Sequence, residues 1–170
     1  MEVPKFLTFL VENKFFGNKS GQGFYKKTAE KDAKGRPVVL GLQLESLEYA
    51  VSTKEKLPIL DTLKQIEELP RRIKAVFKGT DKGAELLQRS LLGLFAYVSN
   101  RVPEISDSAY AIDDALRAGF AWEAGPFQYW DMAGVAEGVD LAEKEGHSIA
   151  AWVKEMLAAG NTTFYKTEGG

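Results

Sequence analysis

"TDKGAELLQRSLLGLFAYVSNRVPEI", residues 80–105, decides the fold because its apolar side chains recur at intervals of three and four. That spacing places them along one wide stripe of an α-helix. Gln88 and Arg89 fall outside the stripe, and Pro103 predicts that the helix bends or ends near Asn100. The stripe consists of Ala84, Leu87, Leu91, Leu94, Phe95, Val98, Val102 and Ile105, of which we expect Leu87, Leu91, Phe95 and Val98 to be buried.

Proline and glycine mark where further helices begin and end. Residues 57–79 show the pattern of two short helices split at Pro70, with Gly79 closing the second. Ser106 is a candidate N-cap for another helix. Further helix boundaries are expected at Gly119, Pro126, Gly134, Gly146 and Gly160. The sequence therefore predicts an all-α fold, with five to seven helices after Leu57 and a short extended N-terminal appendage.

The N-terminal segment pairs a predicted helix over residues 4–16 with the glycine-rich stretch "GNKSGQGFYKK", residues 17–27. This stretch is not a P-loop, because Lys19 and Ser20 come before the second glycine rather than after it. It also lacks the third glycine of a dinucleotide fingerprint, where Lys26 stands. Both nucleotide motifs follow a strand, whereas this one follows a helix. We interpret it as a turn that closes a helix and leads into an extended "GFY".

Residues 28–56 are expected to form a linker. The first ten are polar and charged and contain Gly35 and Pro37, which is typical of an exposed turn. "VVLGLQL", residues 38–44, reads as one extended segment. Since a lone strand cannot bury itself, we expect at most a minor pairing with Phe24-Tyr25.

The composition excludes several classes of site. The formal net charge is -2 and no block of like charge occurs, so neither nucleic acid nor a membrane is expected as a partner. The chain has no cysteine and one histidine, which excludes disulfides, thiolate metal sites and multi-histidine metal sites. A Ser-His-Asp triad would need His147, which we interpret instead as a polar residue between helices. No metal is expected, and the composition fits a cytoplasmic protein.

An internal similarity links the two ends of the chain. "KFFGNKSGQGFYKKT", residues 14–28, and "MLAAGNTTFYKTEGG", residues 156–170, share a Gly-Asn turn, hydroxyl residues and a Phe-Tyr-Lys run. We infer that residues 1–27 end one helical unit and that residues 57–167 form a second unit of the same kind.

Three stretches together resemble the C-terminal helical domain of 3-hydroxyacyl-CoA dehydrogenases. They are "ENKFFGNKSGQGFYKK" (12–27), "FAYVSNRVPEI" (95–105) and "AIDDALRAGFAWEAGPFQYWDMAGV" (111–135). The resemblance implies a multi-helix bundle like the C-terminal domain of 6-phosphogluconate dehydrogenase. The matching motif residues, expected to be structural, are Gly17, Lys19, Ser20, Gly21, Gly23, Phe24, Tyr25, Asn100, Arg101, Asp113, Asp114, Gly125, Pro126, Phe127, Asp131 and Gly134.

The order of these motifs implies a tandem arrangement. In the family the glycine-rich motif closes the domain, whereas here it comes first. The chain is therefore expected to hold the tail of a first helical domain (1–27), a linker (28–56) and a second helical domain (57–167). The resemblance implies that an upstream Rossmann domain binds NAD and supplies the catalytic histidine, and that an enoyl-CoA hydratase is often fused. We expect no catalytic residue and no cofactor within this chain, which should be inactive alone.

Two residues are candidates for lying near substrate. Asn100 matches a family asparagine beside the thioester, although here it belongs to the second copy; alternatively, Asn100 and Arg101 hydrogen-bond neighbouring helix ends. Lys19 is a candidate contact for CoA phosphates. Asp113 and Asp114 point about 100° apart on a helix, so they are not a paired acid and base.

The resulting hypothesis is a non-catalytic helical part of a dehydrogenase, which braces the active site and completes a pseudo-dimer. Its expected partners are the upstream Rossmann domain and the first helical domain, and the chain alone is expected to expose an apolar surface and to form a homodimer. The alternative is a stand-alone helical module that binds acyl-CoA or a protein.

Overall fold

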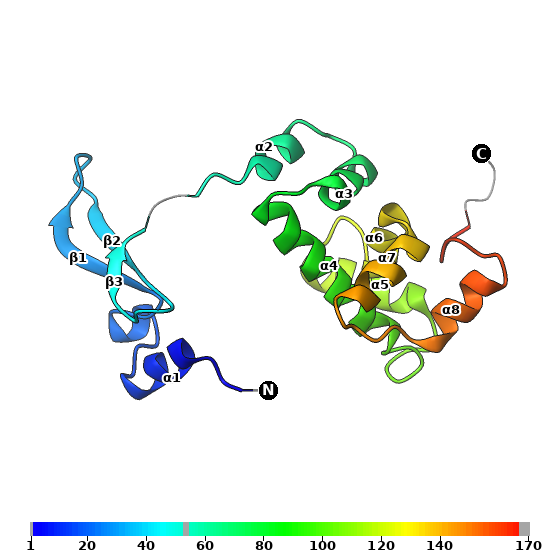
Figure 1. Cartoon of the computed structure of the whole chain (residues 1–170), viewed down its shortest axis with the longest axis horizontal. Coiled ribbons are helices and arrows are strands. Elements are labelled where there is room, and N and C mark those ends of the chain that lie inside the picture. Colours follow the sequence, from blue (N-terminus) through cyan, green and yellow to red (C-terminus); the bar gives the residue numbers. More distant parts are fainter. Residues whose placement is uncertain (1, 53–54, 167–170) are drawn as a thin grey trace. The chain divides into compact units, whose positions relative to one another are not determined.

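The computed structural model of the chain describes residues 2–52 and 55–166. It forms two compact units that divide between Lys56 and Leu57 (Figure 1). The N-terminal unit holds one α-helix and a small sheet, and the C-terminal unit is helical.

The N-terminal unit begins with α1 (Lys5–Glu12) and a short 3-10 helix (Asn18–Ser20). An antiparallel sheet follows, in the order β1-β2-β3. Its strands are β1 (Tyr25–Lys31), β2 (Pro37–Leu42) and β3 (Tyr49–Val51). Tyr25 lies opposite Gly41, so the expected pairing of "VVLGLQL" with Phe24-Tyr25 is confirmed.

The sheet corrects the expectation of an all-α fold with only a minor pairing. Residues 28–56, expected as a linker, contain most of a hairpin because Asp32 organises the turn between β1 and β2. The Asp32 carboxylate accepts hydrogen bonds from Lys34 N (2.8 Å) and Arg36 N (2.9 Å), and it pairs with the Arg36 guanidinium. Gly35 supplies a positive φ of 76°. The charged composition that suggested a linker is that of a solvent-exposed strand and turn.

Helix α1 is shorter than the expected helix 4–16. The Asn13 side chain donates to Phe9 O, and Lys14 adopts a left-handed conformation with φ 58°, so the helix ends before Gly17. Leu10 is buried in the N-terminal unit, whereas Phe16, which follows the helix, is 63% exposed.

The C-terminal unit has seven helices between residues 57 and 158, at the upper limit of the expected number. They are α2 (Pro58–Lys64), α3 (Leu69–Lys78), α4 (Lys82–Ser99), α5 (Ala109–Phe120), α6 (Pro126–Ala133), α7 (Val135–Lys144) and α8 (Ala151–Ala158). The expected end of the long helix near Asn100 is confirmed, as are the boundaries at Pro70, Gly79 and Gly134. The expected N-cap Ser106 is wrong, because the Ser108 hydroxyl accepts from Ala111 N at the start of α5.

The core of this unit is centred on α4. The Phe95 ring is fully buried and stacks between Phe77, at a centroid distance of 6.4 Å, and Trp130, at 4.9 Å. Burial of Phe95 and Val98 is therefore confirmed. Leu87 and Leu91 are only partly buried. The helix is rotated so that Leu92 points into the core, at 3% exposure, while Leu91 faces a groove.

The structure is predominantly helical, as expected, with the small sheet as the exception. Among the described residues, none of the helices is both long enough and apolar enough to cross a membrane.

Candidate functional site

Asp113 joins two consecutive helices of the C-terminal unit, α5 and α6. Its side chain lies on α5, is 1% exposed, and reaches the N-terminus of α6. There the carboxylate accepts hydrogen bonds from Phe127 N (2.9 Å) and Gln128 N (3.0 Å). These amides lack partners within their own helix, so Asp113 acts as a cap supplied from a distance.

Asp131 holds the C-terminal segment against α6. Its carboxylate accepts from Phe164 N (2.8 Å) and Tyr165 N (3.1 Å). The Tyr165 hydroxyl donates to Asp113 Oδ2 at 2.8 Å. The two carboxylates therefore fix the backbone and the side chain of one Phe-Tyr pair.

An aromatic cage receives the Phe164 ring. The ring lies 4.9 Å from Phe127, 5.2 Å from Trp130 and 5.7 Å from Trp152, measured between centroids. Contacts of this kind add to the free energy gained from burying the ring. We call Asp113, Asp131 and this cage the Phe-Tyr clamp.

The ionisable groups of the clamp have shifted pKa values. Burial raises the pKa of the Asp113 and Asp131 carboxyls, although the hydrogen bonds that each receives act in the opposite direction. Burial also raises the pKa of the Tyr165 phenol, and its hydrogen bond to Asp113 raises it further. The phenol therefore stays protonated and serves as a donor to the carboxylate.

Close packing explains two glycines around the clamp. A Cβ at Gly125 would lie 2.3 Å from the Asp113 side chain, so a larger residue would displace the cap. A Cβ at Gly138 would lie 2.3 Å from Trp130 Nε1, which donates to Val135 O. The spacing of the Asp-Asp, Gly-Pro-Phe and Asp-Met-Ala-Gly motifs thus corresponds to a set of direct contacts.

Asp114, the neighbour of Asp113, faces solvent and does not take part in the clamp. Its carboxylate lies 3.4 Å from Arg117 Nη1 on the next turn of α5. The two adjacent carboxylates therefore point to different surroundings. They do not converge on a common substrate position.

Asn100 lies where α4 meets the segment that leads into α8. Its amide donates to Ala96 O and to Ser148 O, both at 2.8 Å. The neighbouring Ser99 is fully buried; its hydroxyl accepts from Ala150 N and its carbonyl accepts from the Trp152 indole. One of these hydrogen bonds closes the end of α4, and the other joins α4 to the segment before α8.

The opening motif forms a self-contained turn in the N-terminal unit. The Ser20 hydroxyl accepts from Phe16 N (2.7 Å) and lies 3.0 Å from Gln22 O. Gly17 and Gly21 have φ of 87° and 81°, and a Cβ at Gly23 would lie 2.7 Å from the Gly17 backbone. The serine and the three glycines of the motif are therefore needed for the shape of this turn. Lys19 lies exposed in the 3-10 helix.

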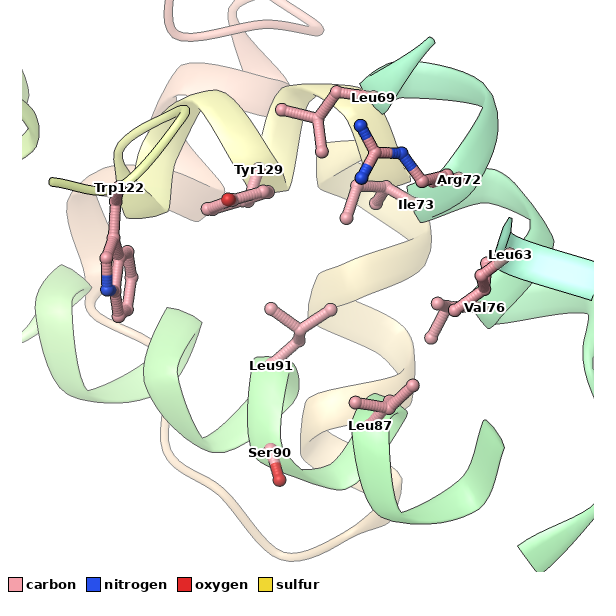
Figure 2. A pocket seen from close by; sticks show the side chains of 10 residues that line it. All are labelled: Leu63, Leu69, Arg72, Ile73, Val76, Leu87, Ser90, Leu91, Trp122 and Tyr129. Atoms are coloured by element: carbon pink, nitrogen blue, oxygen red, sulfur yellow. The ribbon is translucent and has the colours of Figure 1, made fainter. Parts of the chain in front are cut away.

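An apolar groove opens on the C-terminal unit between α3, α4 and the α5–α6 connection. It has a volume of about 390 Å³. Figure 2 shows Leu91 pointing into this space from α4, with Tyr129 across from it and Trp122 at one side. Its lining residues are Leu63, Leu69, Arg72, Ile73, Val76, Leu87, Ser90, Leu91, Trp122 and Tyr129.

Two arginines border apolar hollows along α4. Arg72 lines the groove, and Arg101 lines a smaller hollow of about 210 Å³ with Leu94, Tyr97 and Ile112. The Nε atom of each is buried and has no hydrogen-bond partner within the described residues. A buried donor without a partner is unfavourable by about 1–3 kcal/mol.

Sequence reasoning did not identify the groove or the roles of Arg72, Trp122 and Tyr165. The groove depends on how α3, α4 and the α5–α6 connection pack, which local spacing does not specify. The similarity between the two chain ends did mark Tyr165 as part of a repeated motif. Within residues 2–52 and 55–166, no three His, Asp or Glu side chains gather as they would around a metal ion.

Comparison with known proteins finds relatives by sequence. The chain is 36% identical over 168 residues to a protein of Bacillus subtilis (strain 168) named "Probable 3-hydroxyacyl-CoA dehydrogenase"; the match covers 99% of the chain and 20% of that protein. It is 24% identical over 124 residues to the "Putative fatty acid oxidation complex trifunctional enzyme" of Rickettsia felis, covering 73% of the chain and 15% of that protein. The chain spans a fifth or less of these relatives, and the resemblance indicated by its motifs is confirmed. No family model and no solved structure matches it.

Proposed function

We propose that this chain, which is homologous to part of the 3-hydroxyacyl-CoA dehydrogenases, is a non-catalytic helical part of an NAD-dependent enzyme of that family. The observation that carries the proposal is the match along 99% of the chain to one fifth of a protein with that name. In such an enzyme NAD and the catalytic histidine would belong to another part of the polypeptide. The reaction would be a step of fatty-acid β-oxidation.

The proposed task of the chain is to brace the active-site assembly as the second member of a pseudo-dimer. Two features support it. The Phe-Tyr clamp fastens the C-terminal segment to α5 and α6, which gives a firm scaffold. The apolar groove, with the unpaired Arg72 Nε, offers a surface that a neighbouring helical domain would cover.

The finer parts of the proposal follow from the family resemblance. Residues 1–27 would be the tail of a first helical domain, and residues 57–167 a second domain related to the C-terminal domain of 6-phosphogluconate dehydrogenase. The enzyme would be cytoplasmic and fused to an enoyl-CoA hydratase. The hydrogen bonds of Asn100 support a structural role for this residue, while exposed Lys19 remains the candidate for CoA phosphates.

The test compares this chain with the whole polypeptide encoded by its reading frame. We expect the whole polypeptide to reduce NAD with a 3-hydroxyacyl-CoA, and this chain alone to show neither that activity nor calorimetric binding of NAD. Saturable micromolar binding of NAD by the chain alone would contradict the proposal. So would a whole polypeptide without a strand, glycine-rich loop and helix of the dinucleotide-binding type.

The groove supports one alternative, a stand-alone module that binds acyl-CoA or a protein. Its size falls within the range of small-molecule pockets, and its lining is mainly apolar with one cationic side chain at the edge. Titration of the chain with a medium-chain acyl-CoA separates the two functions. Binding that free CoA does not reproduce, and that Leu91→Glu abolishes, would favour the alternative.

A further inference from the structure

The two similar ends of the chain differ sharply in their surroundings. In the C-terminal unit, Phe164 and Tyr165 are both partly buried, and the clamp holds them through three hydrogen bonds. In the N-terminal unit, the corresponding Phe24 is 45% exposed and Tyr25 is 69% exposed. One Phe-Tyr pair is therefore docked, and the other lies on the surface.

The structure of the two turns supports the sequence similarity. Gly17 and Gly160 both have a positive φ, of 87° and 86°. Each is followed by asparagine and then by a hydroxyl residue that bonds to the backbone of the turn: Ser20 to Gln22 O, and Thr163 to Tyr165 O. The two segments therefore present their Phe-Tyr pairs after turns of similar construction.

The exposed pair retains the groups that the clamp uses. Tyr25 begins β1, which is an edge strand, and its carbonyl accepts a hydrogen bond from Gly23 N at 3.0 Å. Its hydroxyl forms no hydrogen bond within the described residues. The nearest ring contact of Phe24 is Phe6, at a centroid distance of 6.0 Å. Lys26 follows Tyr25 as Lys166 follows Tyr165.

We propose that Phe24-Tyr25 is a docking element for a second helical unit that carries a clamp of the same construction. That unit would place one buried aspartate under the backbone amides, a second against the tyrosine hydroxyl, and an aromatic cage around the phenylalanine. The proposal rests on the proposed function in one respect, which is that the second unit is the first helical domain of the same polypeptide. In this chain Phe164-Tyr165 already occupies the clamp of the C-terminal unit, so that clamp serves in the test as a substitute for the clamp of the second unit.

The test asks whether residues 14–27, as a synthetic peptide, bind an emptied clamp. The acceptor is the full chain carrying Phe24→Ala, Tyr25→Ala, Phe164→Ala and Tyr165→Ala, so that it cannot fill its own site. We expect saturable calorimetric binding of peptide 14–27 and of the native closing peptide 156–166. Adding Asp131→Asn to the acceptor, or Phe24→Ala and Tyr25→Ala to the peptide, should weaken binding at least tenfold.

A second measurement does not depend on the folding of the substituted acceptor. Peptide 14–27 at increasing concentration should compete with Phe164-Tyr165 in the wild-type chain. This competition should shift the indole N–H resonances of Trp130 and Trp152, which line the cage, and the Ala-substituted peptide should not.

Two results would overturn the proposal. One is binding of peptide 156–166 to the acceptor without binding of peptide 14–27. The other is the absence of binding by both peptides together with unshifted indole resonances. NAD and acyl-CoA play no part in these titrations. Their outcome therefore does not bear on the proposed dehydrogenase function, which the measurements of activity and NAD binding test separately.

Discussion

At the scale of single residues, the adjacent Asp113 and Asp114 differ in burial and in the interactions that they form. Asp113 is buried and receives three hydrogen bonds, from two backbone amides and one phenol. The side chain of Asp114 is 44% exposed and forms an ion pair with Arg117, a type of interaction that contributes little to stability near the surface. An acidic pair that looks like an acid–base couple in the sequence therefore consists of one structural group and one surface group.

Replacement of Asp113 should cost far more than replacement of its neighbour. Asp113→Asn places an amide group among three hydrogen-bond donors, so at least one donor loses its acceptor in a buried site. We expect the free energy of unfolding at neutral pH to fall by about 2–3 kcal/mol. The control Asp114→Asn should change it by less than about 0.5 kcal/mol. Equal effects in urea denaturation would show that the α6 cap is unimportant.

The pH dependence of stability should reveal the burial of Asp131. Burial raises the pKa of this carboxyl in the folded state, so the folded protein binds its proton more readily than the unfolded chain does. The preferential binding of this proton by the folded protein adds to the free energy of unfolding at low pH, and the gain is lost as pH rises through the raised pKa. Asp131→Asn has no such proton to bind. We therefore expect the free energy of unfolding of Asp131→Asn to fall further below that of the wild type as the pH of the denaturation experiment is lowered from neutral to about 4. A deficit that shrinks on acidification would contradict this assignment.

At the scale of secondary-structure elements, α4 shows how a wide apolar stripe divides between a core and a groove. Leu92 is 3% exposed and belongs to the core cluster, whereas Leu91 lines the groove. Leu92→Ala should therefore destabilise the chain by about 2–5 kcal/mol. Leu91→Ala, the matched deletion one residue earlier, should cost about 1 kcal/mol, since part of the side chain already contacts solvent. Thermal or chemical denaturation with the opposite ranking would show that the helix is rotated differently.

The approach of α7 to Trp130 provides a second test at this scale. Gly138→Ala adds a methyl group 2.3 Å from the indole nitrogen that donates to Val135 O. We expect a loss of about 1–3 kcal/mol from overpacking. Gly119→Ala in α5 is the control, because a Cβ there has no neighbour within 4 Å. That change should stabilise the helix by about 0.5–1 kcal/mol. A neutral Gly138→Ala variant would indicate that α7 can move away.

The sequence predicted the helices well because their boundaries depend on local signals. Pro70 suits the first turn of a helix, and Gly79 and Gly134 readily leave helical geometry at a helix end, so these boundaries are correct. The hairpin was underestimated because its pairing joins distant residues, and because the polar residues of β1 resemble those of a linker. The burial of Leu91 was overestimated for a similar reason, since this side chain is only partly buried. A wide stripe specifies a helix, whereas the packing of α3, α6 and α7 decides which part of it is buried.

At the scale of the whole molecule, the motifs of the sequence are accounted for by contacts within each unit. Asp113, Phe127 and Asp131, one from each of the three motifs around α5 and α6, belong to the clamp, and Asn100 joins α4 to the segment before α8. Two apolar surfaces take no part in these contacts. They are the groove on the C-terminal unit and the Phe24-Tyr25 pair on the N-terminal unit. Unused apolar surfaces of this kind are typical of a domain that works against other domains.

The groove should therefore cause the isolated chain to self-associate. Two copies that bury their grooves against each other form a symmetric pair, the simplest way to cover one apolar surface. We expect the weight-average mass from light scattering to rise towards twice that of one chain as concentration increases. Leu91→Glu, which places a charge in the groove, should keep the chain monomeric without loss of helical signal. Leu86→Glu is the matched control, because Leu86 lies on the same helix, is 64% exposed and does not line the groove. A wild-type chain that stays monomeric at every concentration, or equal effects of both variants, would show that the groove is not an interaction surface.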